Sequence, residues 1–279
     1  MSICYFNGKF RPTSETALPV TDLIIARGIG VFDSLRSYEH KPFALREHLD
    51  RLRTSAEGIN IRLGGIMEEI KGAIIAGLRR DDCPVAECVI KPFITGGDVN
   101  DFGTFPNPRF FVIFEEGIPV SDAEYKNGVT LSPSNEHRPF PMVKSVNYLV
   151  GIMQSAEQSD VLECLYCPDG EIMETLRASF FMCKDGKIIT APVGRVLNGI
   201  TRKIILEIAR ENGFKIEERA PKLSELADAD ETFITSTWKE VMPVTRVGDI
   251  KIGSGKQGPV AAHLLKLFRE NKHRWLWQE

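Results

Sequence analysis

Lys144 is the residue whose surroundings in the sequence most clearly suggest chemistry. It follows Pro139-Phe140-Pro141-Met142-Val143, an apolar segment framed by prolines. Removal from water lowers the pKa of a lysine and leaves a nucleophilic amine that is able to form a Schiff base. Tyr148 follows four positions later and is a candidate hydrogen-bonding residue near the same site. A surface lysine and a core tyrosine are the alternative interpretations.

Glu174 is the candidate partner of a heterocyclic cofactor. It lies thirty residues after Lys144, in the segment 171–176, which is predicted as the second strand of a hairpin. A carboxylate at a strand end is suited to the protonated nitrogen of a pyridine ring, which is the electron sink of pyridoxal phosphate. Taken alone, this residue is more typical of a solvated glutamate.

Two turns carry hydroxyl groups and glycine in a pattern that is typical of a phosphate site. The segment Leu197-Asn198-Gly199-Ile200-Thr201 opens a helix, and a helix N-terminus favours anions through its N–H groups and its dipole. Gly199 lets the backbone approach an anion, and Thr201 adds a hydroxyl. Ser236 and Thr237 offer two more hydroxyls at the end of a predicted strand. The alternative is a simple helix cap.

Arg51 is the candidate for a fixed positive charge beside the phosphate. It lies on a predicted helix, on one polar stripe with His48 and Ser55. A guanidinium group binds phosphate through charge and paired hydrogen bonds. The alternative is a solvated helix face.

Hydrophobic periodicity and turn signals predict the elements that position these residues. Asn7-Gly8 predicts a hairpin turn, and 96–103 is a polar, glycine-rich loop. Helices are predicted at 47–58, at 67–78, from a start within 198–201 through 212, and at 261–268. Strands are predicted at 4–6, 9–11, 35–38, 87–95, 109–115, 162–167, 171–176, 179–183, 188–191, 232–235 and 241–247. This mixture predicts an α+β protein with a small N-terminal domain (1–117), a linker (118–122) and a larger, strand-rich C-terminal domain (123–279).

Composition narrows the class of protein. The chain has 279 residues, a formal net charge of -3, 43% hydrophobic and 26% charged residues, which is typical of a soluble globular protein. The near-neutral charge disfavours nucleic-acid binding, and no apolar run approaches the roughly 20 residues that cross a membrane. The N-terminus lacks signal-peptide features. Cys164 and Cys167 stand alone as a CxxC pair, so we expect buried thiols, no metal site and a cytoplasmic location.

In their order and spacing these motifs resemble the class IV aminotransferases, the fold type IV family of pyridoxal-phosphate enzymes. That family includes branched-chain aminotransferases, D-amino acid transaminases and aminodeoxychorismate lyases. The matching segments run in family order over nearly the whole chain: Phe6-Asn7-Gly8, Gly28-Ile29-Gly30-Val31-Phe32-Asp33, Glu47-His48-Leu49-Asp50-Arg51-Leu52, Lys144-Ser145-Val146-Asn147-Tyr148, Glu174 with Ser179-Phe180-Phe181, Gly199-Ile200-Thr201-Arg202 and Thr235-Ser236-Thr237.

The resemblance implies a role for each candidate residue. Lys144 would form the Schiff base with pyridoxal 5'-phosphate and shuttle the proton, and Glu174 would pair with the pyridine nitrogen. The remaining cofactor-binding residues would be Tyr148, Leu197 against the ring, and Arg51, Ile200, Thr201 and Thr237 around the phosphate, with Ser236 nearby. The resemblance also implies a homodimer in which the partner's N-terminal domain supplies part of each pocket.

The substrate side departs from the branched-chain pattern. Those enzymes carry an aromatic residue where this chain has Arg27, whereas 22–30 resembles the Asp-Leu-x-x-x-Arg-Gly-x-Gly pattern of an unusual group of D-amino acid transaminases. Lys91 stands where that group usually has arginine. A lysine at this position keeps the positive charge and loses the planar fork of the guanidinium. Lys239 matches a lysine of the same group, and Phe32 completes the candidate substrate-binding set. The alternative for Arg27 is a structural ion pair with Asp22 or Asp33.

These residues favour a D-amino acid transaminase that works by a ping-pong mechanism with a keto acid such as 2-oxoglutarate or pyruvate. An L-branched-chain aminotransferase and an aminodeoxychorismate lyase are the alternative enzymes. A non-catalytic cofactor-binding protein is a further alternative, which the presence of both Lys144 and Glu174 disfavours.

Overall fold

The computed structural model describes residues 2–98, 103–155 and 160–278, and the chain forms two compact units. Unit 1 comprises Met1–Ile118, Val143–Asn147 and Lys272–Glu279, and unit 2 comprises Pro119–Met142 and Tyr148–Asn271. The division expected from the sequence differs in two segments, because it places 143–147 and 272–279 in the C-terminal domain. The segment that carries Lys144 is thus an excursion of the chain back into unit 1.

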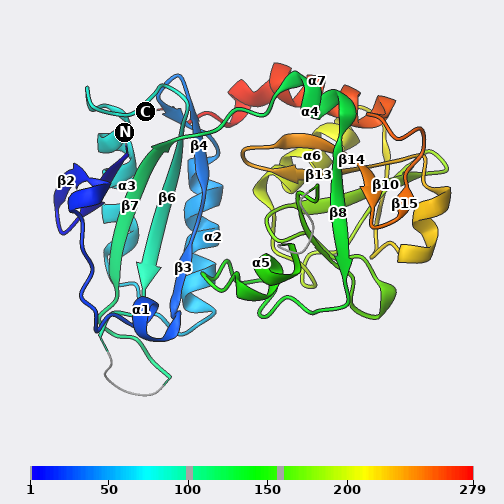
Figure 1. The fold of residues 1–279 in the computed structure, drawn as a ribbon. Helices are drawn as coiled ribbons and strands as arrows, with labels where there is room; N and C mark the ends of the chain where they lie inside the picture. Colours follow the sequence, from blue (N-terminus) through cyan, green and yellow to red (C-terminus); the bar gives the residue numbers. More distant parts are fainter. Residues whose placement is uncertain (1, 99–102, 156–159, 279) are drawn as a thin grey trace. The chain divides into compact units, whose positions relative to one another are not determined.

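Unit 1 is built on an antiparallel sheet (Figure 1). Within the described residues the strand order is β2-β1-β7-β6-β4-β5, and β3 also pairs with β6. The strands are β1 (Ile3–Phe6), β2 (Lys9–Pro12), β3 (Gly30–Phe32), β4 (Leu35–Tyr38), β5 (Lys41–Pro42), β6 (Cys88–Thr95) and β7 (Arg109–Glu116). The predicted Asn7-Gly8 hairpin is confirmed, with φ of 50° and 75° at the two turn residues.

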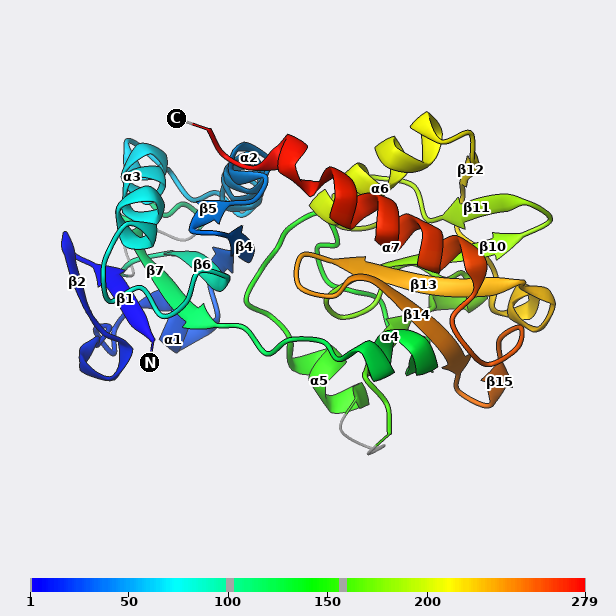
Figure 2. The ribbon, with the colours of Figure 1, turned by 90° about the horizontal axis from the view of Figure 1, so that it is seen from above.

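Helices α2 (Leu45–Glu57) and α3 (Ile66–Leu78) cover one face of this sheet (Figures 1 and 2). Their apolar stripes bury Leu49, Leu52 and Ile74 in the core that they share with the sheet. Two shorter helices precede them, the 3-10 helix η1 (Thr13–Glu15) and α1 (Leu23–Arg27), and η4 (Lys272–Trp275) ends the unit. The prediction did not include α1, which Asp22 caps at its N-terminus and Gly28 ends.

Unit 2 contains a mixed sheet whose order, within the described residues, is β12-β11-β10-β13-β14-β8-β9, with β15 on β14. Pairing is parallel for β11 with β12 and for β8 with both its neighbours. The strands are β8 (Val129–Ser134), β9 (Glu163–Tyr166), β10 (Ser179–Lys184), β11 (Lys187–Thr190), β12 (Lys215–Glu218), β13 (Glu231–Ser236), β14 (Glu240–Val247) and β15 (Ile250–Lys251).

The longer helices of unit 2, α6 (Ile200–Glu211) and α7 (Pro259–Asn271), pack against each other, and both pack against β13 (Figure 2). Helix α5 (Leu149–Ser155) packs on β8 and β9. The remaining helices are α4 (Asp122–Asn127) and the 3-10 helices η2 (Pro168–Gly170) and η3 (Leu223–Asp228). None of the helices in the described ranges is long and apolar enough to span a membrane.

Three sequence-based expectations need comment. The strand predicted at 171–176 is wrong as a continuous strand: isolated bridges join Thr175 to Leu165 and Glu174 to Ser179. Residues 99–102 of the predicted 96–103 loop lie outside the described residues. Cys164 and Cys167 are buried free thiols as predicted, and burial raises their pKa values to about 11 and 12.

Candidate active site

Lys144 is held in unit 1 by backbone hydrogen bonds to β3. The Lys144 carbonyl accepts a hydrogen bond from the Phe32 N–H at 3.0 Å. Two residues later in the chain, the Val146 N–H donates to the Gly30 carbonyl at 3.1 Å. The Lys144 N–H donates to the Ser55 hydroxyl of α2 at 3.1 Å. The lysine is 7% exposed, so the surface alternative is wrong.

The amine of Lys144 lies over an aromatic ring. Its Nζ is 4.8 Å from the centroid of Phe32, which stacks on Phe93, and Phe93 stacks in turn on Phe111. The stack comes from β3, β6 and β7, so three strands of the sheet fix the ring beneath the amine. Phe32 was predicted to bind substrate, and the structure places it beside the candidate nucleophile.

Arg51 makes a forked ion pair with Asp33. The Nε donates to Oδ2 at 2.8 Å and Nη2 donates to Oδ1 at 2.7 Å, while Nδ1 of His48 lies 2.8 Å from Oδ1. Asp33 is fully buried. Burial disfavours its charge, but the charge of Arg51 and the contact with His48 hold its pKa well below its usual range.

The stripe of Arg51, His48 and Ser55 is therefore a buried polar face, and the solvated alternative is wrong. His48 and Ser55 are 1% and 0% exposed. Burial lowers the pKa of His48, and the neighbouring Asp33 carboxylate opposes this effect. The sequence had suggested Asp33 only as a partner of Arg27.

The N-terminus of α6 has the properties of a phosphate cradle. Gly199 precedes the helix without a side-chain cap, and a Cβ there would lie 2.6 Å from the Ser179 hydroxyl. The hydroxyl of Thr201 is buried and, among the described residues, has no hydrogen-bond partner; the same holds for Thr235. An unsatisfied buried hydroxyl costs free energy, which a bound phosphate oxygen would recover. These residues fit the phosphate of the expected cofactor.

The end of β13 lies beside this cradle. Ser179 pairs with Thr235 on β13, and Ser236 and Thr237 come next in the chain. Ser236 accepts a hydrogen bond from the N–H of Lys239 at 3.2 Å, which shapes the turn to β14. The structure therefore brings together the two turns that the sequence assigned to the phosphate, with Ile200 5% exposed as the first residue of α6.

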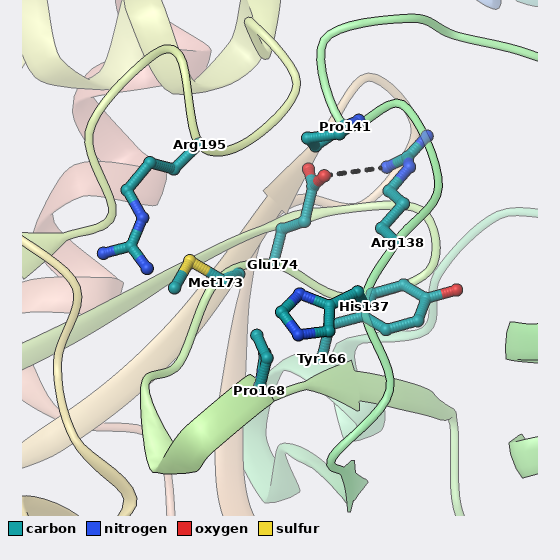
Figure 3. A pocket seen from close by; sticks show the side chains of 8 residues that line it. All are labelled: His137, Arg138, Pro141, Tyr166, Pro168, Met173, Glu174 and Arg195. Atoms are coloured by element: carbon teal, nitrogen blue, oxygen red, sulfur yellow. Dashed lines mark hydrogen bonds and ion pairs between the residues drawn. The ribbon is translucent and has the colours of Figure 1, made fainter.

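Glu174 is buried in unit 2 and bonded to a cation. Its Oε1 accepts from Nη1 of Arg138 at 3.0 Å (Figure 3). The Leu197 N–H lies 3.3 Å from both carboxylate oxygens. Glu174 is 3% exposed, so the solvated alternative is wrong. Arg138 was missed as its partner, although it stands in the same segment as Lys144, six positions earlier.

Tyr148 and Lys239 are both partly buried residues of unit 2. Burial raises the pKa of Tyr148 and lowers that of Lys239. Nζ of Lys239 lies 3.9 Å from Oε1 of the fully buried Glu163, which also accepts from Thr175 and Arg177 at 2.8 Å each. Lys239 therefore faces a carboxylate of its own unit.

Arg27, the last residue of α1, is exposed, and its Nη1 donates to the Ala26 carbonyl at 2.8 Å. Within the described parts of the chain it makes no ion pair: Asp22 is bonded to Thr95 and Arg109, and Asp33 to Arg51 and His48. The alternative that pairs Arg27 with either aspartate is wrong. Lys91, on β6, forms an ion pair with Glu115.

Comparison with known proteins places this geometry in a family. A family model described as class IV aminotransferase matches residues 30–247. The D-alanine aminotransferase of Bacillus licheniformis is 32% identical over 270 residues, which cover 93% of each chain. A putative branched-chain-amino-acid aminotransferase of Methanocaldococcus jannaschii is 31% identical and covers 97% of this chain and 96% of its own.

Solved structures give the same result. The branched-chain amino acid aminotransferase of Escherichia coli matches with a TM-score of 0.88 at 26% identity, over 99% of this chain and 98% of its own. The branched-chain amino acid aminotransferase of T.th., solved with pyridoxamine 5'-phosphate, matches with a TM-score of 0.86 at 26% identity, over 99% and 97%. The chain therefore belongs to the class IV aminotransferase family. The predicted α+β, fold type IV architecture and the cofactor, pyridoxal 5'-phosphate, are confirmed.

Proposed function

We propose that this chain is a D-amino acid transaminase. It would move the amino group of a D-amino acid such as D-alanine or D-glutamate to a keto acid such as 2-oxoglutarate or pyruvate. The observation that carries the proposal is the exposed guanidinium of Arg27, which makes no ion pair within the described residues. Such a group binds a substrate carboxylate through charge and a planar fork. The identity to a D-alanine aminotransferase supports the proposal.

The other two candidate cations have carboxylate neighbours. Lys91 is paired with Glu115, and Lys239 lies near Glu163. A substrate carboxylate has to compete with these groups, whereas at Arg27 it has no such competitor among the described residues. Arg27 therefore carries the larger share of the proposed selectivity.

The proposed mechanism assigns each step to a residue of this chain. Bound pyridoxal phosphate supplies an electron sink for the charge that develops at Cα of the substrate. Lys144 would take the Cα proton and return it at the acceptor carbon, because its amine is held over Phe32 by the β3 hydrogen bonds. Glu174 would keep the pyridine nitrogen protonated. The other proposed cofactor contacts are Arg51, Ile200, Thr201, Ser236 and Thr237 at the phosphate and Leu197 and Tyr148 at the ring.

We also propose that the enzyme is a cytoplasmic homodimer in which the partner's N-terminal domain contributes to each pocket. Helix α5 exposes apolar side chains, with Leu149 at 73%, Ile152 at 53% and Met153 at 59%. The opposite face of α5 packs closely against Leu176 at Gly151, because a Cβ on this glycine would lie 2.3 Å from a Leu176 methyl group. An apolar helix face of this kind supports burial against a second copy, and light scattering of the purified protein tests it.

Single half-reactions test the proposed specificity. The cofactor-loaded protein is mixed with D-alanine, D-glutamate, L-leucine or L-glutamate, and the absorbance of the bound aldehyde form is followed. We expect conversion with the D-amino acids, and Arg27→Ala to slow it by about 10- to 100-fold, because one charge-assisted contact is lost. Arg27→Lys, which keeps the charge, is the matched control. Fast conversion with L-leucine and none with either D-amino acid would overturn the proposal.

An L-branched-chain aminotransferase is the second candidate function. The identity of 31% to a putative enzyme of that activity and the similarity to the Escherichia coli structure favour it. The same half-reactions separate the two candidates. Release of pyruvate from aminodeoxychorismate would instead indicate the lyase.

A further inference from the structure

A cavity of about 220 Å³ adjoins Glu174 within unit 2 (Figure 3). Eight side chains line it: His137, Arg138, Pro141, Tyr166, Pro168, Met173, Glu174 and Arg195. The residues proposed to hold the cofactor phosphate are not among them. We propose that this cavity binds a small oxyanion, a carboxylate or a phosphate, through Arg138 and Arg195, and that its occupancy is coupled to Glu174.

The charges of the lining favour an anion. The lining contains two guanidinium groups and one imidazole but only one carboxylate. Arg138 is only 12% exposed and uses Nη1 for Glu174, and no other partner of its guanidinium is found among the described residues. Arg195 uses Nη2 for Glu171 at 2.6 Å. A guanidinium has five N–H donors in a fixed fork, so both arginines keep donors for a ligand.

The size and the walls of the cavity suit a small ligand. Since one water takes up about 30 Å³ in the liquid, the space exceeds that of several waters and accommodates an ion of four to seven heavy atoms. Pro141 and Pro168 restrict the backbone on the walls, and Met173 and Tyr166 add apolar surface. An anion here would therefore exchange part of its hydration for the guanidinium N–H donors that Arg138 and Arg195 do not use for their glutamate partners.

The coupling of the cavity to Glu174 follows from Arg138, which belongs to both. The guanidinium that donates to Glu174 also lines the cavity, so an oxyanion that draws it away weakens the positive charge beside the carboxylate. When a ligand and a carboxylate share one guanidinium, binding of the ligand changes the interaction of the guanidinium with the carboxylate, and that interaction changes the affinity for the ligand by the same factor. This step rests on the proposed role of Glu174 at the pyridine nitrogen, and it predicts that the anion alters the absorbance of the bound cofactor.

Calorimetry of the cofactor-loaded protein tests the binding site. Inorganic phosphate and malonate are titrated separately at constant ionic strength set with chloride, so the two arms distinguish a phosphate from a carboxylate ligand. We expect saturable binding of at least one, and Arg195→Ala to weaken it by about 10- to 100-fold. Arg210→Ala is the control, because Arg210 is also an exposed arginine that pairs with a glutamate, Glu218, at 2.9 Å. Absence of binding, or equal affinity in Arg195→Ala, overturns the site.

The absorbance spectrum of the same samples tests the coupling. We expect a spectral change that saturates at the calorimetric dissociation constant and is absent from Arg195→Ala at the same anion concentration. Binding without a spectral change refutes the coupling and leaves the site standing. Failure of the proposed function appears separately, in the half-reactions with D- and L-amino acids and in borohydride trapping of the cofactor on Lys144, and neither result alters the calorimetric one.

Discussion

The buried pair of Asp33 and Arg51 gives a prediction whose size follows from the structure. Asp33→Asn keeps the shape of the side chain but removes the charge that faces two nitrogens of Arg51. Asp33 is fully buried and the Arg51 side chain is 10% exposed, so the guanidinium keeps its charge with little access to water. Breaking a buried ion pair from one side costs about 3–5 kcal/mol, and we expect a loss of unfolding free energy in this range.

The dependence of this loss on pH follows from the lowered pKa of Asp33. A carboxyl whose pKa is lower in the folded state stabilises the fold at pH values above its unfolded pKa, about 3.9 for aspartate. That stabilisation declines as the pH falls below this value toward the folded pKa. The free-energy difference between wild type and Asp33→Asn is therefore expected to be constant from pH 8 to about 5 and to narrow below about 4.

Urea unfolding followed by circular dichroism measures this difference. The control is Asp50→Asn on α2, the helix that carries Arg51, because Asp50 is 57% exposed and its contacts with Arg46 and Arg53 are both 3.9 Å long. An exposed pair of this kind contributes about 0–1 kcal/mol. A loss below about 1 kcal/mol in Asp33→Asn at pH 7, or equal losses in the two variants, would refute the argument from burial.

Three further predictions concern the amine, the phosphate cradle and the core. Lys144→Ala is expected to abolish transamination and borohydride trapping, and trapping on another lysine would contradict its role. Thr201→Val should raise the dissociation constant for pyridoxal phosphate by about 10- to 100-fold, with Thr201→Ser near wild type, as measured by equilibrium titration. Gly77→Ala should destabilise unit 1 by about 1–3 kcal/mol in urea, because its Cβ would lie 2.2 Å from the ring of Phe114. Gly72→Ala on the same helix, where a Cβ meets nothing within 4 Å, should instead stabilise it.

The sequence predicted the elements best where a local signal decides the backbone. The Asn7-Gly8 turn and helix α6 appear as predicted because turn chemistry and the helical period are properties of a short stretch. Helix α1 was missed because it has only five residues, although the capping side chain of Asp22 and the glycine at 28 mark both ends. The stretch 171–176 was predicted as a strand, but only one bridge, between Thr175 and Leu165, joins it to β9, and another joins Glu174 to Ser179 of β10.

The candidate site was predicted in its chemical types and less well in its partners. Lys144, Glu174 and Thr201 were identified because each residue type suits one part of a pyridoxal-phosphate site and because their order and spacing resemble those of class IV aminotransferases. Their settings were not predictable, because no local pattern shows that residues 143–147 pair with β3 or that Glu174 is buried. Burial is a property of the folded unit, and it excludes the surface alternative for Lys144 and the solvated alternative for Glu174.

The partners of the charged groups show most clearly why spacing alone is insufficient. Sequence proximity suggested Asp22 or Asp33 for Arg27, yet Asp22 is bonded to Arg109, eighty-seven positions away, and Asp33 to Arg51, eighteen away. Adjacent strands and packed helices bring distant charges together, and the buried carboxylates select the nearest cations in space. The exposed arginine at position 27 is left outside these pairs within the described chain. Among the described residues, the lack of an ion pair at Arg27, on which its proposed role in substrate binding rests, is thus a consequence of how the fold satisfies its buried aspartates.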